Sequence, residues 1–199
     1  MAFTQVDRSE VQLAPPGEDT YGLRVFVEEW RDGATGQAER RWKYHLPDGV
    51  QVLGFTTDGR VIAITEFRPG IGRYLHLVGE TFEPDEEPAT EDTILAAARR
   101  GLREETGYKA GPLELLTGIL ENAGKSDRAT HYVLARDCEW VADPEPGIEV
   151  CLLAPQELWA ALMGYFLADP RARHAGGNSL KLMALAFERL GFVTIKGGA

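Results

Sequence analysis

The segment from Thr90 to Gly107 constrains the fold most, because it carries both the start and the stop signals of one helix. Thr90 is a residue type that caps helix N-termini, and Gly107 suits the left-handed conformation that ends a helix. Between them, Ile94, Ala98 and Leu102 recur every four residues, which places them on one face. The pattern predicts an amphipathic helix that buries this face.

Segments with strand patterns lie on both sides of this helix. Alternating or β-branched apolar residues predict strands at 23–27, 42–46, 50–55, 61–64, 113–116, 131–135 and 149–153. Asp58-Gly59 predicts a hairpin turn. Two further helices are expected near the end of the chain, one from Pro155 to Leu167 and one capped by Asn178 or Ser179, running to Leu190 with Gly191 as its stop. This order of elements predicts an α+β or layered α/β/α domain.

The chain is long enough for one domain of ordinary size, with 199 residues of which 44% are apolar. Residues 1–20 are polar and end in Ala-Pro-Pro-Gly, so we expect an N-terminal arm there and a single domain over 21–199. Cys138 and Cys151 form neither a metal-binding nor a disulfide pattern, and we expect reduced, structural thiols.

The net charge of −10 argues against a nucleic-acid backbone or an anionic membrane surface as the partner. The first residues lack a targeting pattern, and no apolar run approaches the roughly 18 residues of a membrane helix. We therefore expect a cytoplasmic protein with neither nucleic acid nor membrane as partner.

Two adjacent carboxylates, Glu104 and Glu105, stand near the end of the predicted helix. Position 101 shares their face at spacings of three and four, and it holds a glycine. Neighbouring carboxylates repel each other unless a cation lies between them, and Mg²⁺ prefers such oxygen ligands. The alternative is a solvated helix face with weak ion pairs to the flanking arginines.

The region 79–108 resembles the Nudix box: a glycine, five residues, a glutamate, seven residues, then Arg-Glu-aliphatic-x-Glu-Glu-x-Gly-aliphatic. The matching residues are Glu86, Arg100, Glu104, Glu105 and Gly107. Upstream, Glu-Phe-Arg-Pro-Gly at 66–70 resembles the ADP-ribose pyrophosphatase branch. The resemblance implies a Nudix-like α/β/α sandwich with a mixed sheet, an N-terminal antiparallel strand extension, and a homodimer built through the N-terminal strands.

The chain departs from this pattern at two key positions. The opening glycine of the box falls on Glu80, and the first helix glutamate falls on Gly101. The loop before Arg100 is also six residues longer than the pattern, and Asn122-Ala123-Gly124 replaces the Ser-Pro-Gly of the branch. We hypothesise that Glu80 supplies the missing carboxylate and that Gly101 leaves room for it. In the alternative, Glu80 faces solvent and the site is degraded.

The resemblance also implies roles for individual residues. Mg²⁺ or Mn²⁺ is expected on Glu104, Glu105 and the carbonyl of Gly79, with Glu105 also catalytic, and the hypothesis above adds Glu80 to these metal ligands. A loop glutamate is expected to activate water, and Glu149 is slightly preferred to Glu145, although Glu149 also fits the start of a strand. The predicted substrate-binding residues are Arg68, Glu86 and Arg100, where a surface ion pair is the competing interpretation for Arg68.

Other polar and aromatic residues give weaker signals. His45, His76, His131 and His174 share no metal-ligand spacing and are interpreted as structural. Trp30, Trp42 and Tyr44 fit a base-stacking surface, a core or a dimer contact.

The leading functional prediction is a metal-dependent hydrolase that cleaves the pyrophosphate of ADP-ribose or a nucleotide sugar. Its products would be a nucleoside monophosphate and a sugar phosphate. Because position 101 is a glycine, a Nudix-fold protein that binds such a nucleotide ligand without cleaving it stays an alternative. Different chemistry on the same scaffold is a third, since a fold does not fix a function.

Overall fold

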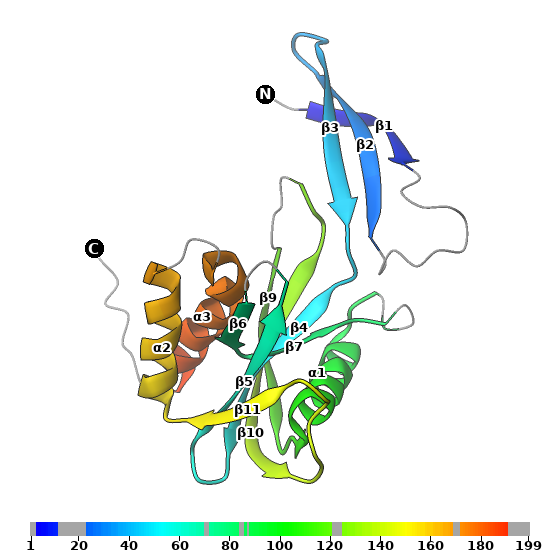
Figure 1. Ribbon diagram of the computed structural model, residues 1–199. Helices are drawn as coiled ribbons and strands as arrows, with labels where there is room; N and C mark the ends of the chain where they lie inside the picture. Colours follow the sequence, from blue (N-terminus) through cyan, green and yellow to red (C-terminus); the bar gives the residue numbers. More distant parts are fainter. Residues whose placement is uncertain are drawn as a thin grey trace. The chain divides into compact units, whose positions relative to one another are not determined.

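The computed structural model describes residues 3–11, 23–69, 72–83, 86, 88–120, 125–168 and 172–190, without the side chains of 165–168, 172–177 and 188. Its elements are coloured along the chain in Figure 1. They are β1 (Phe3–Val11), β2 (Arg24–Asp32), β3 (Ala38–His45), β4 (Gly49–Thr56), β5 (Val61–Arg68), β6 (Gly72–His76), β7 (Val78–Thr81), α1 (Glu91–Thr106), β8 (Tyr108–Lys109), β9 (Leu113–Leu120), β10 (Ala129–Trp140), β11 (Glu149–Leu153), α2 (Pro155–Ala168) and α3 (Ala172–Arg189). The chain divides into two compact units, Met1–Asp48 with Ile119–Thr130 and Gly49–Gly118 with His131–Ala199.

The first unit contains a three-stranded sheet in the order β1-β2-β3. Both pairings are antiparallel, and Trp42 of β3 lies opposite Val27 of β2. Sequence reasoning gave no strand to residues 1–20, yet Phe3–Val11 pairs along β2. Most of these strand residues are exposed, so their apolar pattern was weak and the backbone pairing itself forms the element. The expected N-terminal antiparallel extension is confirmed.

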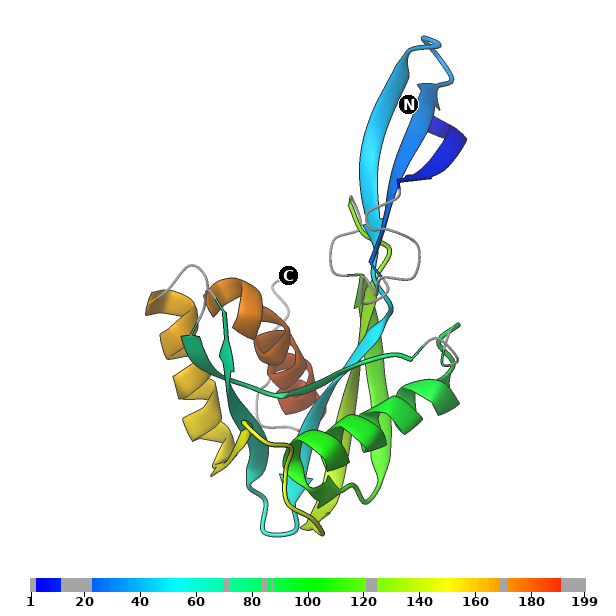
Figure 2. The same ribbon diagram turned by 45° about the vertical axis from the view of Figure 1, so that its right-hand side comes forward.

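The second unit is built on an eight-stranded sheet whose main path is β11-β5-β4-β10-β8. The short strands β6 and β7 pair with β5 and β4 in antiparallel fashion. Helix α1 covers one face of this sheet, and α2 and α3 cover the other (Figures 1 and 2). The predicted α+β class with a sheet between helices is thus confirmed.

Helix α1 begins and ends at the residues that the sequence indicated. The hydroxyl of Thr90 accepts a hydrogen bond from the Thr93 N–H, and the Thr93 hydroxyl accepts one from the Thr90 N–H, which together form a capping box. At the other end, Gly107 has φ 74° and its N–H donates to the Arg103 carbonyl. Both helix ends therefore have partners for backbone groups that a helix leaves unsatisfied.

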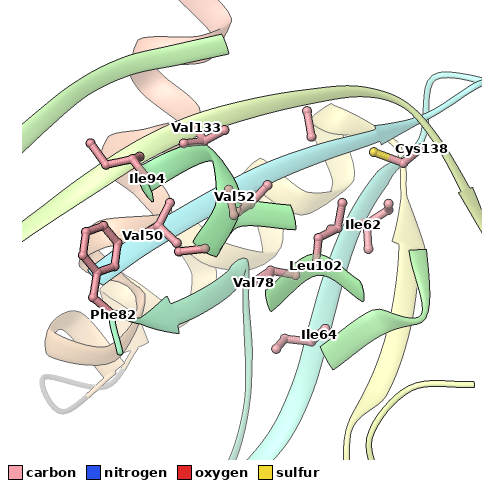
Figure 3. Packing of buried hydrophobic residues seen from close by; sticks show 13 residues of the cluster. Val50, Val52, Ile62, Ile64, Val78, Phe82, Ile94, Leu102, Val133 and Cys138 are labelled. Atoms are coloured by element: carbon pink, nitrogen blue, oxygen red, sulfur yellow. The ribbon is translucent and has the colours of Figure 1, made fainter. Parts of the chain in front are cut away.

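The predicted apolar face of α1 is buried against the sheet (Figure 3). Ile94, Ala98 and Leu102 are at most 4% exposed and join Ile62 and Ile64 of β5 in one core cluster. This packing fixes the rotation of α1 about its axis. The carboxylate-bearing turn of α1 is thereby held in a defined place relative to the sheet.

The predicted start of α3 is wrong. Neither Asn178 nor Ser179 caps it, because the helix already begins at Ala172. Ser179 is fully buried, and its hydroxyl accepts hydrogen bonds from Gln51 Nε2 and Leu77 N, each at 3.1 Å. A helix-capping residue type here serves a tertiary contact, which a local pattern does not reveal. The predicted stop at Gly191 lies outside the described residues.

Further expectations concern the thiols and membrane segments. Cys138 and Cys151 are both free, as predicted, and burial raises the pKa of the Cys138 thiol to about 11. None of the helices in the described part of the chain has the length and apolar content needed to cross a bilayer. The division into an arm over 1–20 and one domain over 21–199 stays a prediction.

Candidate functional site

Glu105 lies where the last turn of α1 meets strand β7. Its Oε2 accepts a hydrogen bond from the Gly79 N–H at 3.3 Å. The contact joins two parts of the predicted box that are 26 positions apart in the sequence. The core packing of α1 and the pairing of β7 with β4 hold the two elements together.

The environment of Glu105 favours its neutral form. Burial, above all, raises the pKa of Glu105 to about 8, and the hydrogen bond from Gly79 opposes the rise. The negative charges of Glu80, Glu66 and Glu145 raise it further. Three other carboxylates, from separate parts of the chain, therefore act on Glu105, and a bound cation would relieve this repulsion.

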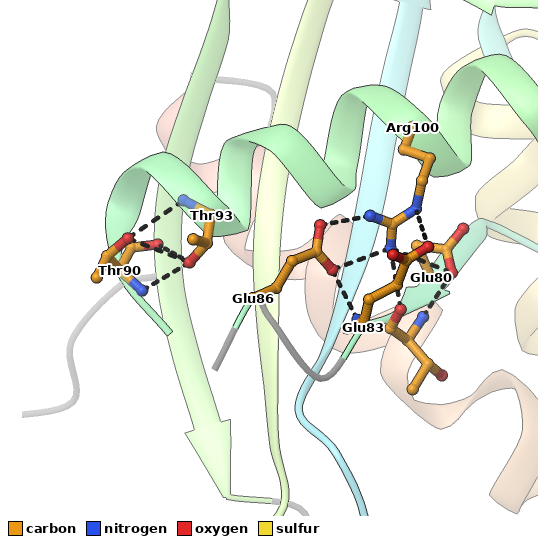
Figure 4. Close-up of polar contacts among 7 residues, drawn as sticks. Glu80, Glu83, Glu86, Thr90, Thr93 and Arg100 are labelled. Carbon is orange, nitrogen blue, oxygen red and sulfur yellow. Dashed lines mark hydrogen bonds and ion pairs between the residues drawn. The ribbon is translucent and has the colours of Figure 1, made fainter. Parts of the chain in front are cut away.

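Glu80 lies against Gly101, as the paired departures from the box suggested. A Cβ atom placed on Gly101 would be 2.7 Å from Glu80 Cβ and 3.2 Å from Glu80 Oε2. Glu80 Oε1 accepts a hydrogen bond from the Thr81 N–H at 3.0 Å and lies 3.7 Å from Arg100 Nη2 (Figure 4). Burial raises the pKa of Glu80, Arg100 lowers it, and the charge of Glu104 raises it again. The side chain is thus beside the helix rather than free in solvent.

Arg100 and Glu86, both predicted to bind substrate, pair with each other (Figure 4). Both Arg100 terminal nitrogens donate to the Glu86 carboxylate, and Nη2 also donates to the Thr81 carbonyl at 3.1 Å. Glu86 accepts a further hydrogen bond from the Glu83 N–H. This network fastens the loop after β7 to α1, and it favours a structural role for both residues over substrate contact. Their role toward substrate stays a prediction.

The structure distinguishes the two loop glutamates. Glu145 donates its backbone N–H to the Glu104 carbonyl at 3.0 Å, so its loop lies against the end of α1. Its charge acts on the pKa of Glu105. Glu149 starts β11 and pairs with Arg73, as the strand alternative supposed. The geometry therefore favours Glu145 over Glu149, contrary to the slight preference drawn from the sequence.

Glu66 is a site residue that sequence reasoning did not assign. Its Oε1 lies 2.7 Å from Arg68 Nη2 and 2.9 Å from His76 Nε2, and it accepts a hydrogen bond from the Tyr74 hydroxyl. The two-residue period of a strand could have indicated Glu66 as a site residue, because residue 66 follows Ile62 and Ile64 on the same face of β5. That face packs against α1, so a carboxylate there points toward the predicted site.

Arg68 forms the ion pair with Glu66 that sequence analysis gave as the alternative to phosphate binding. The two roles are compatible, because the Arg68 side chain is 56% exposed and its guanidinium has donors left over. The charge of Glu105 also contributes to raising the pKa of Arg68, which places this cation within the electrostatic range of the site.

The histidines take no part in a metal centre within the described residues. His76 is buried, its Nδ1 donates to the Leu77 carbonyl at 2.8 Å, and its ring stacks on Tyr74. His45 pairs with Asp127, and His131 stacks on Phe82. The side chain of His174 lies outside the described part. These contacts agree with the structural interpretation.

The donor set fits a hard divalent cation. Across the described ranges, no three His, Cys, Asp or Glu side chains already stand in the arrangement of a complete metal centre. Mg²⁺ does not require one, because it is commonly held by one or two carboxylates together with water and phosphate oxygens. Glu80, Glu104 and Glu105 provide such oxygens, and Glu105 also feels the charges of Glu66 and Glu145.

Comparison with known proteins identifies the family of this chain. The model of the NUDIX domain matches residues 45–173. An ADP-ribose pyrophosphatase of Bacillus subtilis (strain 168) is 34% identical over 103 residues, and the match spans 52% of that relative and 51% of this chain. The crystal structure of an ADP compounds hydrolase has the same fold, with a TM-score of 0.71 over 96% of both chains at 18% identity. Because the domain match covers more than half of the sequence, the chain belongs to the Nudix family.

Proposed function

We propose that this protein is a divalent-metal-dependent pyrophosphohydrolase. Its substrate is a nucleoside diphosphate joined to a further group, either ADP-ribose or a nucleotide sugar. The products are a nucleoside monophosphate and a sugar phosphate. The similar relative from Bacillus subtilis is named an ADP-ribose pyrophosphatase, which supports this substrate class.

The observation that carries the proposal is the half-buried Glu105 among other carboxylates. Its pKa of about 8 reflects burial above all, and the charges of Glu80, Glu66 and Glu145 raise it further. Repulsion among these carboxylates costs stability, and a bound cation would relieve it. The nearby guanidinium of Arg68 adds a fork suited to paired phosphate oxygens.

Each residue has a defined task in the reaction. Glu104 and Glu105, with the Gly79 carbonyl, would hold Mg²⁺ or Mn²⁺. When bound, the cation would neutralise charge on the pyrophosphate and acidify a water molecule. Arg68 binds and orients the phosphate groups.

The bond changes follow from this placement. The water oxygen forms a bond to one phosphorus, and the bond from that phosphorus to the bridging oxygen breaks. Glu145, with its backbone N–H tied to the end of α1, accepts the proton that the water loses.

The glycine at 101 favours one alternative function, ligand binding without cleavage. In that case the site holds the nucleotide ligand but lacks the carboxylate needed for turnover. The two functions differ in whether products form, since both require the same ligand class.

Incubation with ADP-ribose or nucleotide sugars in the presence of Mg²⁺ or Mn²⁺ tests the proposal, with products followed by chromatography. We expect turnover that falls at least about a hundredfold in Glu105→Gln. Glu91→Gln is the matched control, because residue 91 lies at the opposite end of α1, about 21 Å away at 1.5 Å per residue. Ligand binding with no product from the native chain would support the binding protein instead.

A further inference from the structure

We propose that Glu80 supplies the cation-binding carboxylate that α1 lacks at Gly101, so that the ligand has moved from the helix to strand β7. The inference rests on the proposed function, because it concerns the divalent cation of the same site. It assigns a ligand to a position where the box pattern has glycine. It also explains why the two departures from the pattern occur together.

Steric exclusion is the first argument. A Cβ at position 101 would stand 2.7 Å from Glu80 Cβ, closer than real Cβ atoms approach other carbons. The Glu80 side chain therefore occupies the space next to Gly101 and tolerates no side chain there. Conversely, a glutamate at 101 requires a small residue at 80. The two positions exclude each other, so the site has room for one carboxylate, from either element.

Orientation is the second argument. Glu80 Oε1 is fixed by the Thr81 N–H and lies near Arg100, while Oε2 lies 3.2 Å from the Cβ position of residue 101. The carboxylate thus extends along the part of α1 from which a glutamate at 101 would project. Glu105 lies close by, because its Oε2 accepts a hydrogen bond from the N–H of Gly79, the residue before Glu80.

In a simpler role, Glu80 would serve only as the ion-pair partner of Arg100, but Arg100 does not need it. Arg100 lies 3.7 Å from Glu80 but makes two hydrogen bonds to Glu86 and a third to the Thr81 carbonyl. The guanidinium is therefore well paired without Glu80.

Mn²⁺ binding to the purified protein, followed by the electron paramagnetic resonance signal of free Mn²⁺, tests the inference without reference to activity. We expect Glu80→Gln to weaken Mn²⁺ binding at least about tenfold, because the amide keeps the shape but loses the charge. Glu83→Gln is the control: Glu83 also approaches Arg100, at 4.0 Å, but its side chain is 63% exposed. Its affinity should match that of the native chain.

A reciprocal exchange tests the geometry. Gly101→Glu alone should bind Mn²⁺ poorly or fold poorly, because it forces two side chains into one space. Adding Glu80→Gly should restore folding, measured by circular dichroism, and return the Mn²⁺ affinity to within about threefold of native. An exchange variant that folds but does not regain affinity would contradict the inference.

Unchanged Mn²⁺ affinity in Glu80→Gln would overturn the inference, as would the lack of saturable binding by the native chain. Product formation is measured on the same samples. Weakened binding in Glu80→Gln without any product from the native chain leaves the inference standing and refutes the hydrolase. Product formation by the native chain together with unchanged Mn²⁺ binding in Glu80→Gln supports the hydrolase and refutes the inference about Glu80.

Discussion

Glu105 makes the stability of the metal-free protein depend on pH. Its pKa is about 8 in the folded chain, against 4.5 for the unperturbed group. Between these values the folded chain holds a proton that the unfolded chain has lost, so the free energy of unfolding falls as the pH rises. Below about 4.5 and above about 8 the two states carry the same charge at this residue, and its contribution is constant.

The first prediction concerns this slope. In EDTA, we expect the native chain to lose up to about 1.4 kcal/mol of stability per pH unit between roughly pH 5 and 8 relative to Glu105→Gln. Urea unfolding at several pH values measures the difference. Glu91→Gln should keep the native slope. Parallel pH profiles for the native chain and Glu105→Gln would show that Glu105 ionises normally.

The second prediction separates the structural role of Arg100 from substrate binding. Because Arg100 joins α1 to Glu86 and the Thr81 carbonyl, Arg100→Ala should cost about 1–3 kcal/mol in urea unfolding. The KM for ADP-ribose should change less than about threefold. Combined with Glu86→Gln, the losses should be clearly less than additive, because both variants break the same pair. A large rise in KM at native stability would instead support substrate contact.

At the scale of elements, the local patterns predicted what local forces determine. Thr90 and Gly107 bounded α1, and β5 and β11 followed from β-branched and alternating residues. Tertiary contacts decided the rest: β7 exists through pairing with β4, and Ser179 lies inside α3 to bind Gln51 and Leu77.

In the candidate site, too, some features were predictable from the sequence and others depend on tertiary contacts. The pairing of Glu80 with Gly101 was predicted from two compensating departures in the sequence, and the structure brings these residues into contact. Preferring Glu145 to Glu149 as the proposed base required knowledge of where the loop folds back on α1. Glu66 was missed because its importance comes from the face of β5 that it shares with Ile64.

The third prediction concerns the end of α1 and the loop that carries Glu145. Gly107 has φ 74°, and a Cβ there would lie 1.9 Å from the Ala142 carbonyl oxygen. Gly107→Ala should therefore destabilise the protein by more than about 2 kcal/mol and lower turnover by displacing the loop. Gly147→Ala is the control, since Gly147 has φ 94° with open space around its Cβ position. If both variants lose equal stability, the close approach to Ala142 has no cost.

At the scale of the whole molecule, the structure of the N-terminal sheet bears on the expected homodimer. The strand β3 is the last of this sheet and is bridged on its outer side at Tyr44, to Ser126, while Trp42 on the same strand is 64% exposed. Edge strands invite pairing, and a large exposed aromatic residue is typical of the centre of a protein interface. We therefore expect this sheet to contain the dimer contact.

Light scattering of the native chain at micromolar concentration should give the mass of a dimer, and Trp42→Glu should give that of a monomer. A charge on the apolar contact leaves a buried, unpaired carboxylate, which costs several kcal/mol and should raise the dimer Kd by about a hundredfold or more. Trp140→Glu is the control, because Trp140 is 61% exposed but lies on β10 outside the N-terminal sheet. It should remain dimeric. A native chain that is monomeric, or loss of the dimer through Trp140→Glu alone, would exclude this interface.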